Sequence, residues 1–118
     1  MKTLVVGVKP GSNRYANLAV QKLVAAGHEV VALGRTAGEE SGVVVQTGTP
    51  ELHGIDTITL YLNAANQQPL TDYILSLSPR RIVFNPGAEN AALADRAAAA
   101  GIETVEACTL VMLTVGQY

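Results

Sequence analysis

Apolar residues come in blocks along the chain, and the first blocks predict two strands with a helix between them. Residues 4–8 are an unbroken apolar run, which is typical of a central parallel strand covered on both faces. From Tyr15 onward apolar residues recur at helical spacing, and Gly27 is placed to end that helix. Glu29–Leu33 is again mostly apolar and predicts the second strand, which ends at Gly34.

The next apolar block is short and follows a polar stretch. Residues 36–42 are polar and contain glycine, so we interpret them as a loop. Val43-Val44-Val45 then predicts a short third strand, which we place at an edge of the sheet. Residues 57–62 alternate between apolar and polar positions and predict the fourth strand.

The second half of the chain continues this alternation of elements. Apolar spacing over residues 70–77 predicts a second helix, in which Pro69 fits only in the first turn. Arg81–Phe84 predicts the fifth strand, and an alanine-rich third helix follows it. Residues 102–105 predict a short sixth strand. The apolar tail, residues 110–113, is too short for its period to decide between helix and strand.

Strands that alternate with helices at this spacing predict one α/β domain over residues 1–118. We expect a doubly wound, mostly parallel sheet of five to six strands with helices on both faces. In such sheets ligands bind beyond the carboxyl ends of the strands, near the point where the strand order reverses. The predicted loops on that edge are residues 7–14, 34–35, 63–67, 85–90 and 107–109.

Composition and charge narrow the classes of partner. With 48% apolar and 15% charged residues, the 118-residue chain fits a soluble globular protein. Its net charge of −2 argues against a general nucleic-acid binder, because no broad basic face can form. No apolar run reaches the roughly 18 residues that a membrane span needs, and the first residues lack the pattern of a signal peptide. A single cysteine suits a reducing compartment. We therefore expect a cytoplasmic protein that binds neither membranes nor nucleic acid.

The loop after the first strand, GVKPGSNR, contains glycines but matches neither well-known phosphate loop. A dinucleotide fingerprint reads G-x-G-x-x-G, whereas three residues separate Gly7 from Gly11, and one of them, Pro10, has no N–H to donate. The P-loop pattern, G-x-x-x-x-G-K-[ST], is absent as well.

The same loop can still hold a phosphate. Ser12 or Asn13 can cap the helix that follows, and the free N–H groups at a helix N-terminus favour an anion. Lys9 and Arg14 add two cations beside that point. The alternative is a capped helix start with solvated basic residues, and the loop by itself does not decide between the two interpretations.

The end of the second strand argues against plain NAD as the ligand. An NAD site normally has an acidic residue there, about 20 residues past the glycine loop, which accepts hydrogen bonds from the ribose hydroxyls. This chain has Leu33-Gly34-Arg35 instead. A cation at Arg35 suits a phosphorylated ribose, as in NADP or a 3′-phosphorylated adenosine, and an ordinary solvated arginine is the alternative.

Four segments carry a resemblance to a known family: VVGVKPGSNRYANLAVQKLVAAGHEVVAL, DTITLYLN, RRIVFNPGAEN and AGIETVEACTLVML. The chain resembles the small stand-alone CoA-binding proteins, which are related to the N-terminal CoA-binding domain of the succinyl-CoA synthetase α subunit. The first and third segments are together the most specific, because family members have a glycine turn followed by Arg/Lys-x-Ser/Ala-Asn, and a Pro-Gly turn, at these places. Family members commonly have Pro-Val-Asn-Pro after the second strand, where this chain has Ala32-Leu33-Gly34-Arg35.

This resemblance implies a Rossmann-like domain that binds CoA or acyl-CoA and has no catalytic residues of its own. The diphosphate would lie on the loop 7–14, with Asn17 helping to hold that loop, and the adenosine would lie over the ends of the second and third strands. Asn63 and the Asn85-Pro86-Gly87 turn would border the path of the pantetheine. The cofactor-binding residues expected on this basis are Gly7, Val8, Lys9, Gly11, Ser12, Asn13, Arg14, Asn17, Gly34, Arg35, Asn63, Asn85, Pro86 and Gly87. The implied roles are a sensor or a partner subunit, as a homodimer or beside a CoA-ligase-type protein.

Catalytic and metal-binding patterns are not visible in the sequence. Cys108 is the only possible thiol nucleophile, and its apolar context favours a packed residue. His28 and His53 precede strands, so we expect both on the edge away from the ligand. No spacing of cysteine or histidine matches a metal site. We expect no enzyme and no metal; the alternatives are an NADP-type redox or redox-sensing domain, and a decayed Rossmann-like interaction module.

Overall fold

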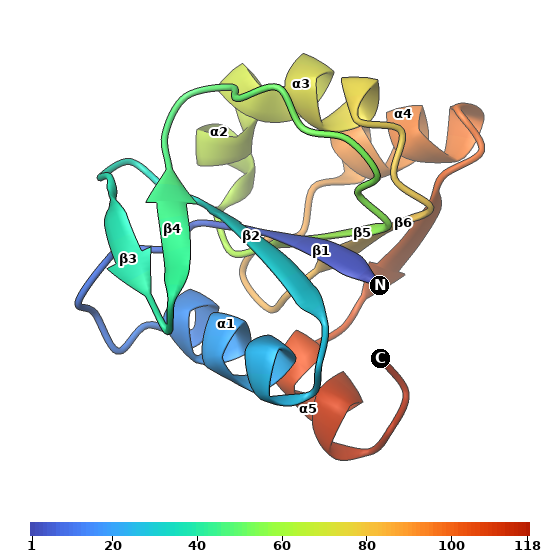
Figure 1. Cartoon of the computed structure of the whole chain (residues 1–118). Helices are drawn as coiled ribbons and strands as arrows, with labels where there is room; N and C mark the ends of the chain where they lie inside the picture. Colours follow the sequence, from blue (N-terminus) through green and yellow to red (C-terminus); the bar gives the residue numbers. More distant parts are fainter.

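Seven strands form a single sheet in the order β3-β4-β2-β1-β5-β6-β7 (Figure 1). The computed structural model describes residues 1–118. All neighbouring strands are parallel except β3 and β4, which pair antiparallel. The strands are β1 (Lys2–Val6), β2 (Glu29–Leu33), β3 (Gly38–Glu40), β4 (Val43–Gln46), β5 (Thr57–Leu60), β6 (Arg81–Phe84) and β7 (Glu103–Glu106).

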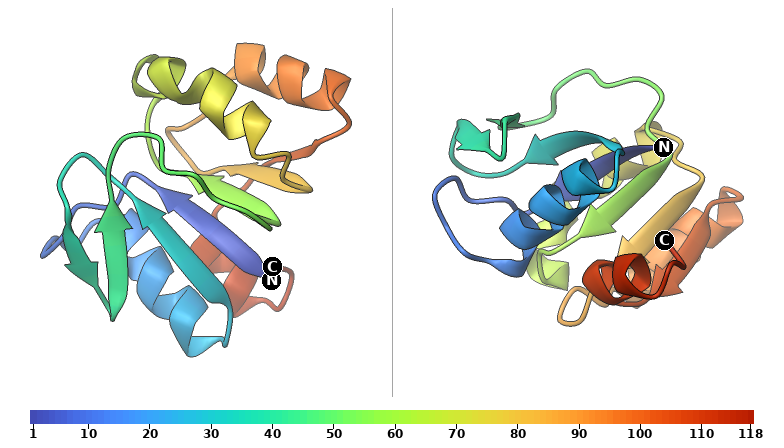
Figure 2. Two further views of the ribbon diagram at one scale, coloured as in Figure 1. Left: turned by 45° about the horizontal axis from the view of Figure 1, so that its top comes forward. Right: turned by 60° about the horizontal axis from the view of Figure 1, so that its bottom comes forward.

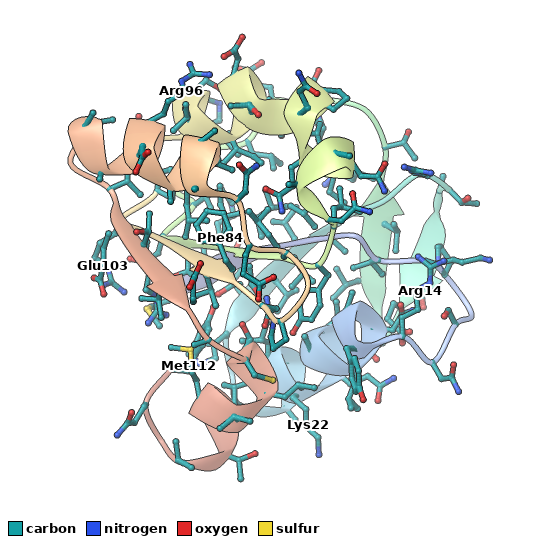
Figure 3. All side chains as sticks on the ribbon, turned by 180° about the vertical axis from the view of Figure 1, so that it is seen from behind. Arg14, Lys22, Phe84, Arg96, Glu103 and Met112 are labelled. Carbon is teal, nitrogen blue, oxygen red and sulfur yellow. The ribbon has the colours of Figure 1, made fainter.

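Helices cover both faces of this sheet (Figure 2). One face carries α1 (Tyr15–Ala25) and α5 (Thr109–Thr114), and the other carries α2 (Ala64–Gln67), the short 3₁₀ helix η1 (Gln68–Leu70), α3 (Thr71–Ser76) and α4 (Ala91–Ala99). The apolar core is accordingly split by the sheet into two clusters, of 13 and 7 buried residues. Phe84, in the larger cluster, lies deep in the interior (Figure 3). The predicted doubly wound α/β fold is confirmed.

The sheet has one strand more than the five to six expected, because residues 36–42 are not all loop. Gly38–Glu40 forms β3 and pairs with β4, so β3 rather than β4 is the edge strand. Ser41 and Gly42 between them both have positive φ, 52° and 80°, which is the backbone of a tight two-residue hairpin turn. Gly38–Glu40 is polar and shows no apolar alternation that would predict a strand. It forms a strand because the turn at Ser41 and Gly42 folds it back against β4.

The second helical segment begins earlier than its apolar spacing predicts. Residues 63–67, expected as a loop, are mostly α2, because the Asn63 side chain accepts a hydrogen bond from the backbone N–H of Asn66 at 2.9 Å and caps the helix. Pro69 lies in η1, where a missing N–H is tolerated. The apolar tail, left undecided by its sequence, forms α5.

The strand order reverses beside β1, whose neighbours are β2 on one side and β5 on the other. The connections leaving these strands therefore diverge to opposite faces, which opens a crevice at the carboxyl ends of β1, β2 and β5. The longest helix, α1, has 11 residues, and none of the helices has the length and apolar character to cross a bilayer.

Candidate functional site

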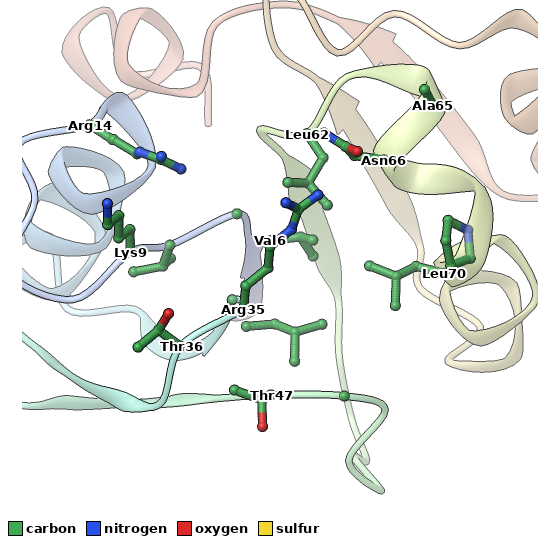
Figure 4. Close-up of a pocket in the computed structure, with 16 residues that line it drawn as sticks. Val6, Lys9, Arg14, Arg35, Thr36, Thr47, Leu62, Ala65, Asn66 and Leu70 are labelled. Carbon is green, nitrogen blue, oxygen red and sulfur yellow. The ribbon is translucent and has the colours of Figure 1, made fainter.

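A pocket of about 690 Å³ lies at the carboxyl ends of β1, β2 and β5, at the point where the strand order reverses (Figure 4). This volume is within the range of small-molecule sites, roughly 300–1,000 Å³. Six of the residues predicted from the sequence are among the 16 that line it: Gly7, Val8, Lys9, Arg14, Gly34 and Arg35.

The charge of the pocket is entirely positive. Lys9, Arg14 and Arg35 line it, and no aspartate or glutamate does. None of these three cations makes an ion pair, whereas elsewhere Lys2, Arg80 and Arg96 each lie within 4.0 Å of a carboxylate. Three uncompensated cations around one cavity favour an anionic ligand.

The pocket has an apolar side opposite its basic side. In Figure 4 Lys9 and Arg14 lie on one side of the cavity, Leu62, Ala65 and Leu70 on the other, and the Arg35 side chain extends between them. A ligand with an anionic part and a flat or aliphatic apolar part matches this division.

The floor of the pocket is built by close contact of two turns, the one after β1 at Gly7 and Val8 and the one after β2 at Gly34. The backbone N–H groups of Gly7 and Val8 both donate to the carbonyl oxygen of Leu33, at 2.9 and 3.1 Å. A Cβ atom at Gly34 would lie 1.9 Å from the carbonyl oxygen of Val8, so the two turns meet only because residue 34 has no side chain. Gly7 itself has φ of +110°, a conformation that favours glycine.

Asn17 holds the loop between β1 and α1. Its side chain is fully buried, donates from Nδ2 to the carbonyl oxygen of Lys9 at 2.7 Å, and accepts from the Lys9 N–H at Oδ1 at 3.3 Å. The same Nδ2 donates to Oε1 of Glu40 at 2.7 Å. Asn17, from α1, thus holds the main chain of Lys9 directly, and Glu40, from β3, holds the Asn17 side chain.

The start of α1 carries no side-chain cap, so the prediction that Ser12 or Asn13 caps it is wrong. Arg14 occupies the N-cap position with extended backbone, and the Ser12 hydroxyl accepts from the Arg14 N–H at 3.2 Å instead. The N–H groups of the first turn of α1 are therefore left without a side-chain acceptor, which is the arrangement that favours an anion.

Other predicted site residues lie away from the pocket lining. Gly11, Ser12 and Asn13 continue the loop beyond it, and Asn63 caps α2. Pro86 and Gly87 are exposed in the turn after β6 and do not line the cavity.

Asn85 is turned inward, although the family resemblance places it beside the pantetheine. It is 1% exposed, and its Nδ2 donates to Oγ1 of Thr59 at 2.6 Å and to the carbonyl oxygen of Leu60 at 2.9 Å. Its Oδ1 accepts from the backbone N–H of Thr109 at 2.8 Å. The side chain thus ties β5, β6 and α5 together.

Sequence reasoning missed a residue that positions the apolar wall of the pocket. Gln67 is fully buried, and its Nε2 donates to the carbonyl oxygens of Leu62 and Ala88, both at 2.7 Å. Its Oε1 accepts from Nδ2 of Asn90 at 2.8 Å. A glutamine in a polar stretch gives no signal of such a role. Thr36, Thr47 and Asn66 also line the pocket and were not predicted.

The residues considered for catalysis lie outside the pocket lining. Cys108 is half-buried and unpaired just before α5. The His28 ring meets the Tyr118 ring edge-on at 5.3 Å, and burial lowers the pKa of His28. Burial also raises the pKa of the Tyr61 phenol, to about 12. No group of three or more His, Cys, Asp or Glu side chains is arranged to hold a metal ion.

The fold and the site define a class: a Rossmann-like α/β domain with a cationic pocket at the switch point of its sheet. The family follows from sequence comparison. A family model described as "CoA binding domain" matches residues 1–114, and the chain belongs to this family. No curated protein matches the chain.

Solved structures agree on the fold. The chain is similar to the crystal structure of an uncharacterized protein, with 47% identity, a TM-score of 0.95, and coverage of 99% of this chain and 97% of that one. A structure from Thermus thermophilus, cell-free ID.343, matches at 16% identity and TM-score 0.85, over 99% and 90% of the two chains. An acetyl-coenzyme A synthetase 1 from Ca. Korarchaeum cryptofilum, described as in complex with phosphate and ADP, matches at 16% identity and TM-score 0.73, over 90% of this chain and 25% of that chain.

Proposed function

We propose that this protein binds CoA or acyl-CoA in the pocket at the ends of β1, β2 and β5, as a cytoplasmic module without catalysis. The observation that carries the proposal is the set of three unpaired cations, Lys9, Arg14 and Arg35, in a cavity with no acidic residue. CoA has a diphosphate and a 3′-phosphate on its ribose, together with a flat adenine and a largely aliphatic pantetheine arm, which matches the charge and the division of the cavity. Membership of the CoA binding domain family supports the same ligand.

The diphosphate and the 3′-phosphate of the ligand have separate candidate partners. The uncapped first turn of α1, with Lys9 and Arg14 beside it, suits the diphosphate. Arg35, at the end of β2, suits the 3′-phosphate of the adenosine, and the apolar wall of Leu62, Ala65 and Leu70, beside Asn63, suits the pantetheine. NADP, with its phosphorylated ribose, is the competing ligand for the same cations.

The absence of an acid–base pair in the pocket supports a binding role. The titratable residues that line it are Lys9, Arg14 and Arg35, and none of its lining residues is Asp, Glu, His, Cys or Tyr. A CoA sensor or a partner subunit, either as a homodimer or beside a CoA-ligase-type protein, is the biological role we favour. It is compatible with the occurrence of this fold within the much longer acetyl-coenzyme A synthetase chain.

Calorimetric titration with CoA, dephospho-CoA, NADP and NAD tests the proposal. We expect CoA to bind more tightly than dephospho-CoA, and NAD not to bind. Arg14→Ala should weaken both CoA and dephospho-CoA about five- to thirtyfold, since a charge-assisted hydrogen bond to phosphate contributes about 1–2 kcal/mol. Arg35→Ala should weaken CoA alone, down to the affinity of dephospho-CoA.

Lys22→Ala is the matched control for these variants. Lys22 is an exposed cation on the same helix that Arg14 precedes, but it lies farther along α1 and outside the pocket lining (Figure 3). It removes one positive charge and should leave CoA affinity unchanged. Absence of CoA binding to the wild type, or tighter binding of NADP than of CoA, contradicts the proposed function.

A further inference from the structure

An acidic residue lies directly behind the cationic loop. Glu40, in β3, accepts from Nδ2 of Asn17 at Oε1, at 2.7 Å, and from the Ser41 hydroxyl at Oε2, at 2.9 Å. The Glu40 carboxylate is charged at neutral pH, and the hydrogen bond from Asn17 lowers its pKa further. Figure 1 shows β3 beside the loop that follows β1.

Glu40 completes the hydrogen bonding of Asn17. The amide of Asn17 has two N–H donors and one carbonyl acceptor: one N–H goes to the Lys9 carbonyl, the other to Glu40, and the oxygen accepts the Lys9 N–H. Because Asn17 is fully buried, loss of the Glu40 acceptor leaves one of its N–H groups without its protein partner. The side chain would then shift, and its two contacts to Lys9 with it.

A second contact joins the same strand to the same loop. A Cβ atom at Gly38 would lie 2.7 Å from two side-chain carbons of Pro10, so the backbone of β3 packs directly against the residue after Lys9. The β3–β4 hairpin therefore braces the loop from outside, through Pro10 and through Glu40 with Asn17.

Charge alone does not explain an acid at this place. A carboxylate behind an anion pocket repels the ligand, and an uncharged acceptor would avoid that cost. We propose that Glu40 is a positioning residue of this pocket: acting through Asn17, it fixes the main chain of Lys9 so that the loop is ordered before an anion arrives. This inference rests on the proposed function for its ligand, and on the hydrogen bonds above for its mechanism.

Three variants distinguish a positioning role of Glu40 from an effect of its negative charge. Glu40→Ala removes both the charge and the acceptor, Glu40→Gln removes the charge and keeps an acceptor oxygen, and Glu39→Ala removes the charge of the exposed neighbouring residue. Each is titrated with CoA and with inorganic diphosphate, and its melting temperature is recorded. Hydrogen exchange of the Lys9 amide is followed by NMR in the absence of ligand.

A positioning role and a purely electrostatic role of Glu40 predict opposite changes in affinity for Glu40→Ala. If Glu40 positions the loop, Glu40→Ala binds both probes about three- to tenfold more weakly, and Glu40→Gln and Glu39→Ala bind at least as well as the wild type. The Lys9 amide then exchanges about tenfold faster in Glu40→Ala alone. Tighter binding in all three variants, or unchanged exchange of Lys9 in Glu40→Ala, overturns the inference.

The exchange measurement keeps this inference distinct from the proposed function. A wild type that binds neither CoA nor diphosphate contradicts the proposed function. In that case the Glu40–Asn17–Lys9 link is still tested by comparing the exchange rate of the Lys9 amide in Glu40→Ala with that in Glu40→Gln. Weaker binding by both Glu40 variants, with equal exchange of Lys9, also contradicts positioning, because the acceptor is present in one of them.

Discussion

The turns after β1 and β2 are in contact under the pocket at Gly34. We therefore expect Gly34→Ala, which adds a single methyl group, to destabilise the protein strongly. The new Cβ would lie 1.9 Å from the carbonyl oxygen of Val8, whereas real Cβ contacts stay beyond 3.0 Å, so one turn must move by about 1 Å. Three hydrogen bonds oppose that movement: Gly7 and Val8 donate to the Leu33 carbonyl, and the Gly34 N–H donates to the Gln46 carbonyl at 2.9 Å.

Weakening two or three backbone hydrogen bonds at about 1 kcal/mol each, with some added strain, gives a loss of about 2–4 kcal/mol in the free energy of unfolding. For a domain of this size each kcal/mol lowers the melting temperature by about 4 °C, so we expect a fall of about 8–16 °C in circular dichroism melts. The loop that carries the pocket cations moves too, so CoA affinity should fall in the fraction that stays folded.

Gly38→Ala is the matched comparison for Gly34→Ala. Its Cβ would also clash, at 2.7 Å, but with the side chain of Pro10 rather than with backbone, and on an edge strand that can yield. We expect a smaller fall in melting temperature, of about 4 °C or less. A Gly34→Ala protein that melts within about 2 °C of the wild type, or above Gly38→Ala, would refute the claim that the two turns are in unavoidable contact.

Three further predictions concern stability. Asn85→Ala should lower the free energy of unfolding in urea by about 2–4 kcal/mol, because it leaves buried partners on β5 and α5 unpaired; a change below about 0.5 kcal/mol would argue against its bridging role. The hydrogen bond from Arg80 lowers the pKa of Asp56, so the stability it contributes is present above the unfolded pKa and is lost as pH falls through the folded pKa. Melts from pH 5 to pH 2 should therefore fall less steeply in Asp56→Asn than in the wild type, and parallel curves would count against the ion pair. Burial raises the pKa of Tyr61 to about 12, so the folded state favours the protonated phenol, and stability should be lost as pH rises from about 10 through 12. Tyr61→Phe should remove that part of the alkaline loss, which difference absorbance at 295 nm can follow in parallel.

The layers of the fold could be predicted from the sequence because its helices and most strands carry their own periodicity. β2 and β6 have the bounds that their apolar runs predict, since each is followed by a clear turn. β3 could not be found in this way. Gly38–Glu40 has no apolar residue, and it becomes a strand only because the turn at Ser41 and Gly42 folds it against β4.

The candidate site was predictable where it depends on topology and not where it depends on side-chain direction. Lys9, Arg14 and Arg35 follow strands β1 and β2, so the carboxyl-edge rule alone brings them to one cavity. Asn85 also follows a strand on that edge, but its side chain satisfies buried groups on β5 and α5 instead. Gln67 and Glu40 each have a hydrogen-bond partner more than 20 positions away, Ala88 and Asn17, which no local pattern encodes.

Direct mapping of CoA on the protein by NMR tests the central claim in one titration. If CoA binds as proposed, amide resonances of the loop 7–17 and of residues 34–36 shift saturably, and those of Asn85, Gly87 and α5 move less. Shifts confined to the far edge of the sheet, or no saturable shift at millimolar CoA, would contradict the account.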